Sequence, residues 1–345
     1  MLKKIPIIVL FFILFIGCSG NRDSKDSNKL IRIGFSASSE MFLQERWDKD
    51  IKIFMSKAKE LGAEVILAKS PNTIKNQISQ IQYLSKQNID ILVVIPKDKE
   101  NLRSILKRVI DRGIPVIAYD RLIMGVPLAG YVSFDNREVG RIMARALIEE
   151  TPNGNYLVVN GSIHDNNSFE VNKGLHEILA PYLRSGQIKI SEEIWLDAWS
   201  YDEALEKISN ILLFNQDIQA ISAANDDIAQ AAIKVLAERQ MVGKVAVVGQ
   251  DADLISCQSV VEGSQLLTVY KPIAKLAIRA AEIVVDIVKD QKITPDSYIS
   301  NNSSNSAPFF MEEPIGVNKN NMDITVIKDG FHSKKDVYRE FVAQK

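Results

Sequence analysis

Residues 89–119, IDILVVIPKDKENLRSILKRVIDRGIPVIAY, carry the repeating unit that decides the fold. Ile89–Ile95 is an almost continuously apolar run, as a strand covered on both faces requires. The helical pattern that follows has its apolar positions at Leu102, Ile105, Val109 and Ile110. Gly113 marks the end of this helix, and Ile114–Tyr119 is again strand-like. Together these segments predict one strand–helix–strand unit of a parallel sheet.

The same alternation extends in both directions from this unit. Further strands are expected at Ile31–Phe35, Val65–Leu67, Tyr131–Phe134, Tyr156–Val159, Ile194–Leu196, Ala220–Ala224, Val245–Val248 and Leu266–Tyr270. Amphipathic helices are expected between them, and Asn72 is a candidate cap for the helix that follows it. Strands that alternate with helices indicate a doubly wound α/β fold with right-handed crossovers. The units are too numerous for one small sheet, so we expect two such lobes.

The regular alternation of strands and helices does not continue in the C-terminal part of the chain. Short strands are expected at Phe309–Met311 and Ile324–Ile327, where the chain could cross back between the lobes. Ser333–Lys345 has the composition of a charged, frayed tail.

Length and composition limit the classes of protein to consider. The chain has 345 residues, which suggests about two domains of ordinary size. Lys and Arg total 42 and Asp and Glu total 43, so the formal net charge is −1 and the basic excess of a nucleic-acid-binding protein is missing. Two cysteines and three histidines are too few for a Cys/His metal site once Cys18 is assigned to a targeting segment. We expect no metal and no cofactor.

The N-terminal segment has the pattern of a secretory signal peptide. Lys3 and Lys4 precede an apolar run, Ile5–Ile16, that is shorter than the about 20 residues of a membrane span. Phe15-Ile16-Gly17-Cys18 resembles a bacterial lipobox, in which Cys18 becomes the lipidated first residue, although Phe replaces the usual Leu. The alternative is cleavage and release. The polar residues 19–29 are expected to form a tether between membrane and domain.

Polar side chains follow many of the expected strands. In open α/β sheets, ligands bind beyond the carboxyl ends of the strands. The residues found there are Arg46 and Trp47, Asp120 and Arg121, Asp165 and Asn167, Trp199, Asn225 and Asp226, Asp251, and Lys271. Carboxylates, amides and cations pair with sugar hydroxyls, and indole faces cover the apolar face of a sugar ring. The near balance of positive and negative charge favours a neutral polyol over a phosphate or carboxylate.

Each of these residues also has a structural interpretation. Asx residues after strands often cap the next helix, and Asp226 and Asn166 are the favoured caps. Trp195 is expected in the core, and Cys257 is expected to be a lone buried thiol. The repetition at several strand ends makes a purely structural explanation of the whole set less favourable than a binding site.

A resemblance to a known family supports this interpretation. The segments of this chain that carry the resemblance are Glu45-Arg46-Trp47, Ala118–Arg121, Ser133–Asn136, Asp165–Asn167, Asn225-Asp226, Gly249–Leu254, Thr268–Pro272, Val317–Asn321 and Val326–His332. Over almost its whole mature length the chain resembles the bacterial D-xylose-binding proteins, of the ribose- and galactose-binding group. The loop Ser36–Phe42 and the tail after His332 are longer than in that family.

The resemblance implies a binding protein and not an enzyme. It implies two Rossmann-like lobes of the periplasmic-binding-protein type I, joined by three crossovers and closing on one sugar. The sugar contacts that it implies are Arg46, Trp47, Asp120, Arg121, Asp165, Asn167, Asn225, Asp251 and Lys271, with Trp199 stacking on the ring. Such proteins deliver sugar to an ATP-driven permease, and relatives serve membrane sensor histidine kinases. The expected location is extracytoplasmic, on the membrane through a lipid.

The expected division of the chain follows from these implications. The segments are the signal peptide 1–17, the lipidated Cys and tether 18–29, a first lobe of 30–133 plus 273–307, a second lobe of 134–272 plus 308–332, and the tail 333–345. The hinge is expected near Phe134-Asp135, Lys271-Pro272 and Ala307-Pro308.

Three alternatives remain beside a D-xylose receptor. The chain could bind another neutral monosaccharide. A transcriptional repressor core shares this fold, but it would need a basic helix-turn-helix segment where the signal peptide lies. A sugar-acting enzyme is the third, and none of the common nucleotide, metalloprotease or hydrolase motifs is found in the sequence to support it.

Overall fold

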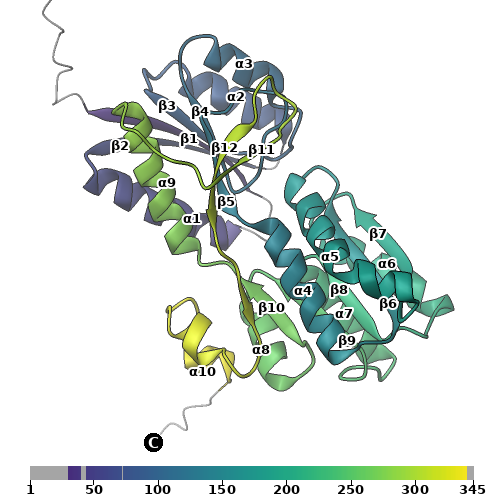
Figure 1. The fold of residues 1–345 in the computed structure, drawn as a ribbon. Helices are drawn as coiled ribbons and strands as arrows, with labels where there is room; N and C mark the ends of the chain where they lie inside the picture. Colours follow the sequence, from purple (N-terminus) through teal and green to yellow (C-terminus); the bar gives the residue numbers. More distant parts are fainter. Residues whose placement is uncertain (1–29, 40–43, 72, 340–345) are drawn as a thin grey trace, which may run out of the picture. The chain divides into compact units, whose positions relative to one another are not determined.

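The computed structural model describes residues 30–39, 44–71 and 73–339. Side chains at 38–39, 44–47 and 70–71 lie outside this description. Strands and helices alternate along the chain and form two mostly parallel sheets, each covered by helices (Figure 1). This confirms the predicted two-lobed, doubly wound α/β fold. None of the helices described is long and apolar enough to cross a membrane.

The first lobe is built on a seven-stranded sheet of order β11-β12-β5-β4-β3-β1-β2. Its strands are β1 (Ile31–Ser39), β2 (Ala63–Pro71), β3 (Ile91–Ile95), β4 (Val116–Tyr119), β5 (Gly130–Phe134), β11 (Ser297–Ile299) and β12 (Ala307–Glu312). Its helices are α1 (Gln44–Glu60), α2 (Ile74–Leu84), α3 (Arg103–Ile110) and α9 (Ile273–Val288). All strands are parallel except β11, which pairs antiparallel with β12.

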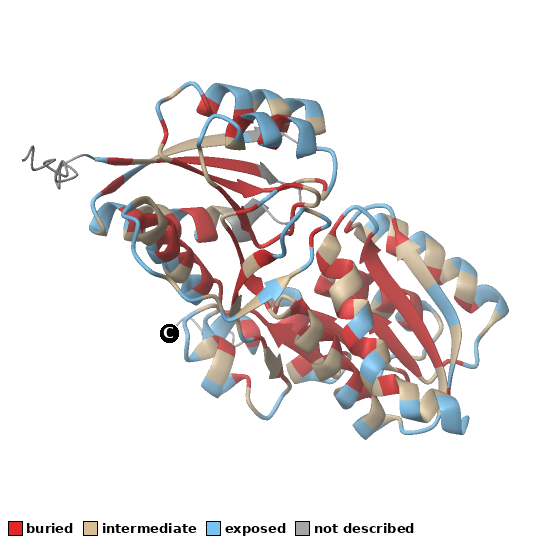
Figure 2. Ribbon diagram, turned by 45° about the horizontal axis from the view of Figure 1, so that its top comes forward, coloured by how far each residue is buried: buried red, intermediate tan, exposed pale blue. Residues whose placement is uncertain are grey.

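Strand β3 shows why the first sheet needs an uninterrupted apolar run. Ile91, Val93 and Ile95 pack into the core beneath α1 and α9, whereas Leu92 and Val94 pack into the core beneath α2 and α3. Every residue of β3 is buried because helices cover both faces of the sheet. Figure 2 shows the same arrangement for the inner strands of both sheets, which are buried, whereas the outer faces of the helices are exposed.

The second lobe is built on a six-stranded sheet of order β13-β10-β9-β8-β6-β7. Its strands are β6 (Gly154–Ser162), β7 (Ile188–Leu196), β8 (Ala220–Ala223), β9 (Ala246–Gln250), β10 (Leu267–Tyr270) and β13 (Ile315–Val317). Its helices are α4 (Asn136–Glu150), α5 (Asn166–Ser185), α6 (Tyr201–Phe214), α7 (Asp226–Glu238) and α8 (Leu254–Glu262). Strand β13, which the sequence did not predict, pairs antiparallel with β10.

The chain passes between the lobes where β5 leads into α4, where β10 leads into α9, and between β12 and β13. The first two crossings coincide with the segments Phe134-Asp135 and Lys271-Pro272. The third prediction, Ala307-Pro308, is wrong, as is the assignment of residues 308–312 to the second lobe. Both lie in β12, which is hydrogen-bonded to β5 of the first sheet. The chain leaves that sheet only after Glu312, because β12 extends the row of parallel strands.

Two local predictions near the C-terminus are also wrong. Ile324–Ile327 is not a strand but lies within η1, a π-helix at Asp323–Ile327. A strand would put Ile324 and Val326 on the same face, yet Val326 is buried in the core and Ile324 is 69% exposed. The expected frayed tail contains a short helix, α10 (Lys334–Val337), whose Val337 is buried beside α8, and its residues 340–345 lie outside the described residues.

The cap of α2 differs from the prediction as well. Thr73 occupies the cap position, and its hydroxyl accepts a hydrogen bond from the backbone N–H of Asn76. Asn72, the predicted cap, lies outside the described residues. The helix begins one residue later than the sequence pattern indicated, so the next hydroxyl takes the role.

Candidate ligand-binding site

Polar residues are buried at the carboxyl ends of the parallel strands. These buried residues are Asp120 and Arg121 after β4, Asp165 and Asn167 after β6, Trp199 after β7, Asn225 after β8 and Lys271 after β10. Asp251, after β9, has a side chain that is 10% exposed. Buried charged and amide side chains need partners, because burial without them is costly. Their partners show how the site is built.

Asp120 lies at a backbone turn that few residues adopt. Its φ is +60°, in the left-handed region that Asp tolerates better than most residues. Its carbonyl oxygen accepts hydrogen bonds from Tyr131 Oη (3.0 Å), Ser133 Oγ (2.6 Å) and Asn167 Nδ2 (3.1 Å). Two of these donors lie on β5 and the third on α5 of the second lobe. The backbone of Asp120 is therefore held in one orientation from both lobes.

Arg121, Asp165 and Trp199 form a buried group. Arg121 Nε lies 2.9 Å from Asp165 Oδ2, and Trp199 Nε1 donates to the same oxygen at 3.1 Å. Burial raises the pKa of Asp165, while the Arg121 guanidinium opposes that rise. Gly161 lets the indole come close, since a Cβ at that position would overlap the Trp199 ring.

Asn167 joins this group to β5. Its Oδ1 accepts from Tyr131 Oη at 3.1 Å, and its Nδ2 donates to the carbonyl of Asp120. Burial raises the pKa of Tyr131 well above its usual range, so the hydroxyl stays a donor. Tyr131 and Ser133 were not predicted as site residues. They lie inside a strand, where the sequence gives no signal that separates them from core residues.

Asp251 and Lys271 form a second ion pair. Lys271 Nζ lies 3.3 Å from Asp251 Oδ1, and both side chains are nearly buried. The turn after β9 has positive φ at Asp251 (104°) and Ala252 (55°). Thr268 Oγ1 accepts from the backbone N–H of Ala252 at 3.0 Å, and His332 Nε2 lies 2.8 Å from the Ala252 carbonyl oxygen. These contacts hold a turn that non-glycine residues rarely adopt.

Gln250, the last residue of β9, is a buried polar residue that the sequence did not predict as part of the site. It is 2% exposed, and its Nε2 donates to the carbonyl of Ala224 at 2.6 Å. Its Oε1 is buried and has no hydrogen-bond partner among the described residues. A buried acceptor without a partner is unfavourable by about 1–3 kcal/mol. The sequence pointed to the segment but not to this side chain.

The helix caps at the site are not the predicted ones. Asn225 caps α7, where its side chain accepts from Ile228 N at 3.0 Å, and Asp165 caps α5, where it accepts from Asn167 N at 2.9 Å. The predicted caps, Asp226 and Asn166, are the first residues inside these helices. Each helix starts directly after the strand-end Asx, so the residue proposed as a ligand contact also caps the helix.

Asp226 is part of a buried network instead. Its carboxylate accepts from Gln265 Nε2 (3.0 Å), Thr268 Oγ1 (2.8 Å) and Asp253 N (3.0 Å). Burial, followed by the neighbouring Asp253, raises the pKa of Asp226 well above its usual range. This network fixes the start of α7 against β10.

Some of the predicted residues lie outside the described part of the chain, and Trp195 is less buried than predicted. Arg46 and Trp47 lie in the first turn of α1, but their side chains are outside the described part of the chain, as are Cys18 and the rest of residues 1–29. Trp195 is only half-buried and stacks on Phe169 with 4.7 Å between ring centroids, so its assignment to the core is only partly right. Cys257 is a free, buried thiol, as predicted, and burial raises its pKa.

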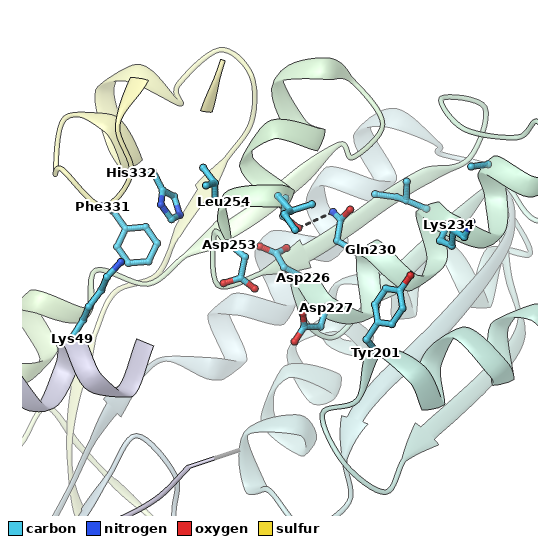
Figure 3. A pocket seen from close by; sticks show the side chains of 14 residues that line it. Lys49, Tyr201, Asp226, Asp227, Gln230, Lys234, Asp253, Leu254, Phe331 and His332 are labelled. Atoms are coloured by element: carbon cyan, nitrogen blue, oxygen red, sulfur yellow. Dashed lines mark hydrogen bonds between the residues drawn. The ribbon is translucent and has the colours of Figure 1, made fainter. Parts of the chain in front are cut away.

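A cavity of about 720 Å³ lies beside the strand ends of the second lobe (Figure 3). Asp226, Asp227 and Gln230 of α7 line it, with Asp253 before α8. Tyr201, Lys49 and His332 also contribute to its wall. None of the ten predicted sugar contacts is among its lining residues. No group of three or more His, Cys, Asp or Glu that could hold a metal occurs within residues 30–39, 44–71 and 73–339.

Fold and site together define a two-lobed binding protein, and comparison with known proteins gives its family. Residues 41–292 match the family model of the periplasmic binding protein domain, so the chain belongs to this family. A D-xylose-binding periplasmic protein of Haemophilus influenzae is 42% identical over 93% of this chain and 95% of its own length. The D-xylose-binding periplasmic protein of Escherichia coli is 41% identical over 85% of this chain and 89% of its own. These matches confirm the predicted resemblance.

More distant relatives share the fold. A multiple sugar-binding periplasmic protein of Azospirillum brasilense is 27% identical over 84% of this chain and 87% of its own length. A carbohydrate transporter solute-binding protein of Chloroflexus aurantiacus, solved with D-glucose, has a TM-score of 0.82 at 23% identity and covers 89% of this chain and 98% of its own. Membership in a family of binding proteins agrees with the expectation that the chain is not an enzyme.

Proposed function

We propose that this chain is an extracytoplasmic receptor for D-xylose that closes on the sugar and presents it to a membrane partner. The observation that carries the proposal is the pairing of buried charges at the strand ends. Arg121 pairs with Asp165 at 2.9 Å, and Lys271 pairs with Asp251 at 3.3 Å. Because both of these cations already have a carboxylate beside them, a ligand next to them needs hydroxyl groups and no net charge.

The proposed sugar contacts are the ten residues expected from the sequence. They are Arg46, Trp47, Asp120, Arg121, Asp165, Asn167, Trp199, Asn225, Asp251 and Lys271. Relatives named for D-xylose, at 41–42% identity, support this sugar over others. The alternative is another neutral monosaccharide, and the relative named for multiple sugars is the reason to keep it.

Calorimetry tests the ligand directly. We expect D-xylose to bind with roughly micromolar affinity or tighter, about −8 kcal/mol or below. D-ribose, L-arabinose, D-glucose and D-galactose serve as comparisons. Tight binding of one of these, with none of D-xylose, would transfer the proposal to that sugar.

The membrane partner and the anchor belong to the same proposal. The partner is a sugar ABC permease or the extracellular domain of a sensor histidine kinase, and Cys18 carries the lipid that holds the chain on the membrane. We expect Cys18→Ala to leave unprocessed precursor or protein without lipid. Mass spectrometry of the mature N-terminus decides, and an unmodified first residue would rule out the anchor.

A further inference from the structure

The loop after β3 contacts the loop after β6, so the first lobe meets the second outside the strand-end residues described above. Lys99 of the first lobe makes two hydrogen bonds there. Its backbone N–H donates to the carbonyl of His164 at 3.1 Å, and its Nζ donates to the carbonyl of Ile163 at 2.9 Å. Lys99 itself is held in the first lobe, because its carbonyl accepts from Met124 N at 2.7 Å.

The ammonium group of Lys99 has a third contact. It lies 3.9 Å from the centroid of the Phe169 ring on α5, within the range of a cation–π attraction. Phe169 in turn stacks on Trp195 of β7. The aromatic pair therefore gives the Lys99 side chain a rigid surface on the second lobe.

His164 forms the other half of the contact. Its Nδ1 lies 3.3 Å from Asp98 Oδ2 of the first lobe, and its Nε2 lies 3.2 Å from Asp197 Oδ1 of the second. Asp98 is fixed by its other oxygen, which accepts from Glu100 N and Asn101 N at 2.7 Å each. The imidazole thus lies between carboxylates of both lobes.

We infer that Asp98, Lys99, His164 and Phe169 form a latch that joins the two lobes and sets the affinity for sugar without contacting it. None of these residues is a proposed sugar contact. Their partners are one another, the side chains of Asp197 and Trp195, and backbone groups. Sugar that bridges the lobes binds the joined state, so the apparent dissociation constant varies inversely with the population of that state. A weaker latch therefore weakens binding of every sugar by the same factor. The effect of the latch on sugar affinity rests on the proposed function.

The lobe arrangement is tested first, without sugar. Spin labels are placed on the full chain at Tyr83→Cys on α2 and Leu213→Cys on α6, which are 55% and 60% exposed, in a Cys18→Ser background. Lys99→Met keeps the aliphatic stem and removes the ammonium. We expect Lys99→Met to shift the distribution of distances between the two spin labels away from that of the parent protein. The melting temperature should be unchanged. Lys107→Met, at an exposed site on α3, is the matched control.

His164→Asn is a second, independent variant, because it removes the bridge between Asp98 and Asp197 and leaves Lys99 intact. We expect His164→Asn to shift the distance distribution in the same direction as Lys99→Met does. If both variants give the distribution of Lys107→Met, the latch is overturned, whichever sugar the protein binds.

Calorimetry then tests the effect on affinity. We expect Lys99→Met to weaken D-xylose binding by about three- to tenfold, and to weaken a second bound sugar by the same factor. Unequal factors would show that Lys99 contacts the ligand and would overturn the inference. An unchanged affinity beside a shifted distance distribution would overturn the claim that the latch sets affinity. A protein that binds no sugar would refute the proposed function but not the latch, which the distance measurement decides.

Discussion

Asn225 combines a structural contact with a proposed ligand contact in one side chain. Its Oδ1 caps α7 by accepting from Ile228 N, and the residue is 2% exposed. Replacing it with Ala removes both the cap and the amide, so the result would mix two effects. Serine keeps a capping oxygen, removes the amide donor and adds no charge, so it separates the cap from the ligand contact.

We therefore expect Asn225→Ser to lower the melting temperature less than Asn225→Ala does, but to weaken D-xylose binding by about 2 kcal/mol, because sugar hydroxyls lose a buried partner. Asn225→Ala should weaken binding similarly and also lower stability by about 1 kcal/mol. Calorimetry and thermal unfolding of the two variants check this. Full affinity in Asn225→Ser would remove Asn225 from the sugar contacts.

Asp227 provides a prediction about pH at the same helix start. Burial, and then the charge of Asp251, raises its pKa from 3.8 to about 6. The folded state therefore binds this proton more tightly than the unfolded state does, and stability falls as pH rises from about 4 to above 6. We expect Asp227→Asn to raise the melting temperature at pH 7.5 and to change it little at pH 4. An equal change at both pH values would show that the carboxylate is not the cause.

At the scale of secondary structure elements, α5 is tied to β7 by an ion pair within a polar network. His176 Nε2 lies 3.0 Å from Glu193 Oε2, and Asn160 and Asn172 donate to the other oxygen of Glu193. The Glu193 contact raises the pKa of His176, and the His176 contact lowers the pKa of Glu193. Both side chains are partly exposed, so solvent weakens the pair.

The pH dependence follows from these two directions. The His176 contribution is full below its ordinary pKa of 6.5 and is lost as pH rises through the raised value. The Glu193 contribution is present above its ordinary pKa of 4.5 and is lost as pH falls through the lowered value. We expect His176→Gln to lower the melting temperature most between about pH 4.5 and 6.5. Lys173→Gln, an exposed variant on the same helix, should show no such maximum.

At the scale of the whole molecule, the proposed function requires the lobes to move. The crossings lie at Phe134-Asp135, Lys271-Pro272 and the Glu313-Pro314 link between β12 and β13. Each is a short segment between regular elements, which suits the few residues that absorb a hinge rotation. The third crossing lies at Glu313-Pro314 and not at Ala307-Pro308. Strand β12 therefore stays hydrogen-bonded to β5 during such a motion.

We expect D-xylose to raise the melting temperature, because it binds only the folded chain. We also expect it to reduce the radius of gyration in small-angle scattering as the lobes close. A thermal shift without any change in scattering would indicate a receptor whose lobes are already joined. In that case the latch, and not the sugar, would determine the arrangement that a membrane partner meets.

The sequence by itself determined the alternation of strands and helices and the polar residues at the strand ends. Both depend on local patterns, namely the period of apolar residues and the order of neighbours along the chain. The tertiary structure alone decided that β12 joins the first sheet, that Ile324–Ile327 forms a π-helix, and that Arg121 pairs with Asp165. It also showed that the hydroxyl of Tyr131 donates a hydrogen bond to Asn167. These depend on contacts between residues far apart in the chain, and no local pattern encodes which distant partner satisfies a buried polar group.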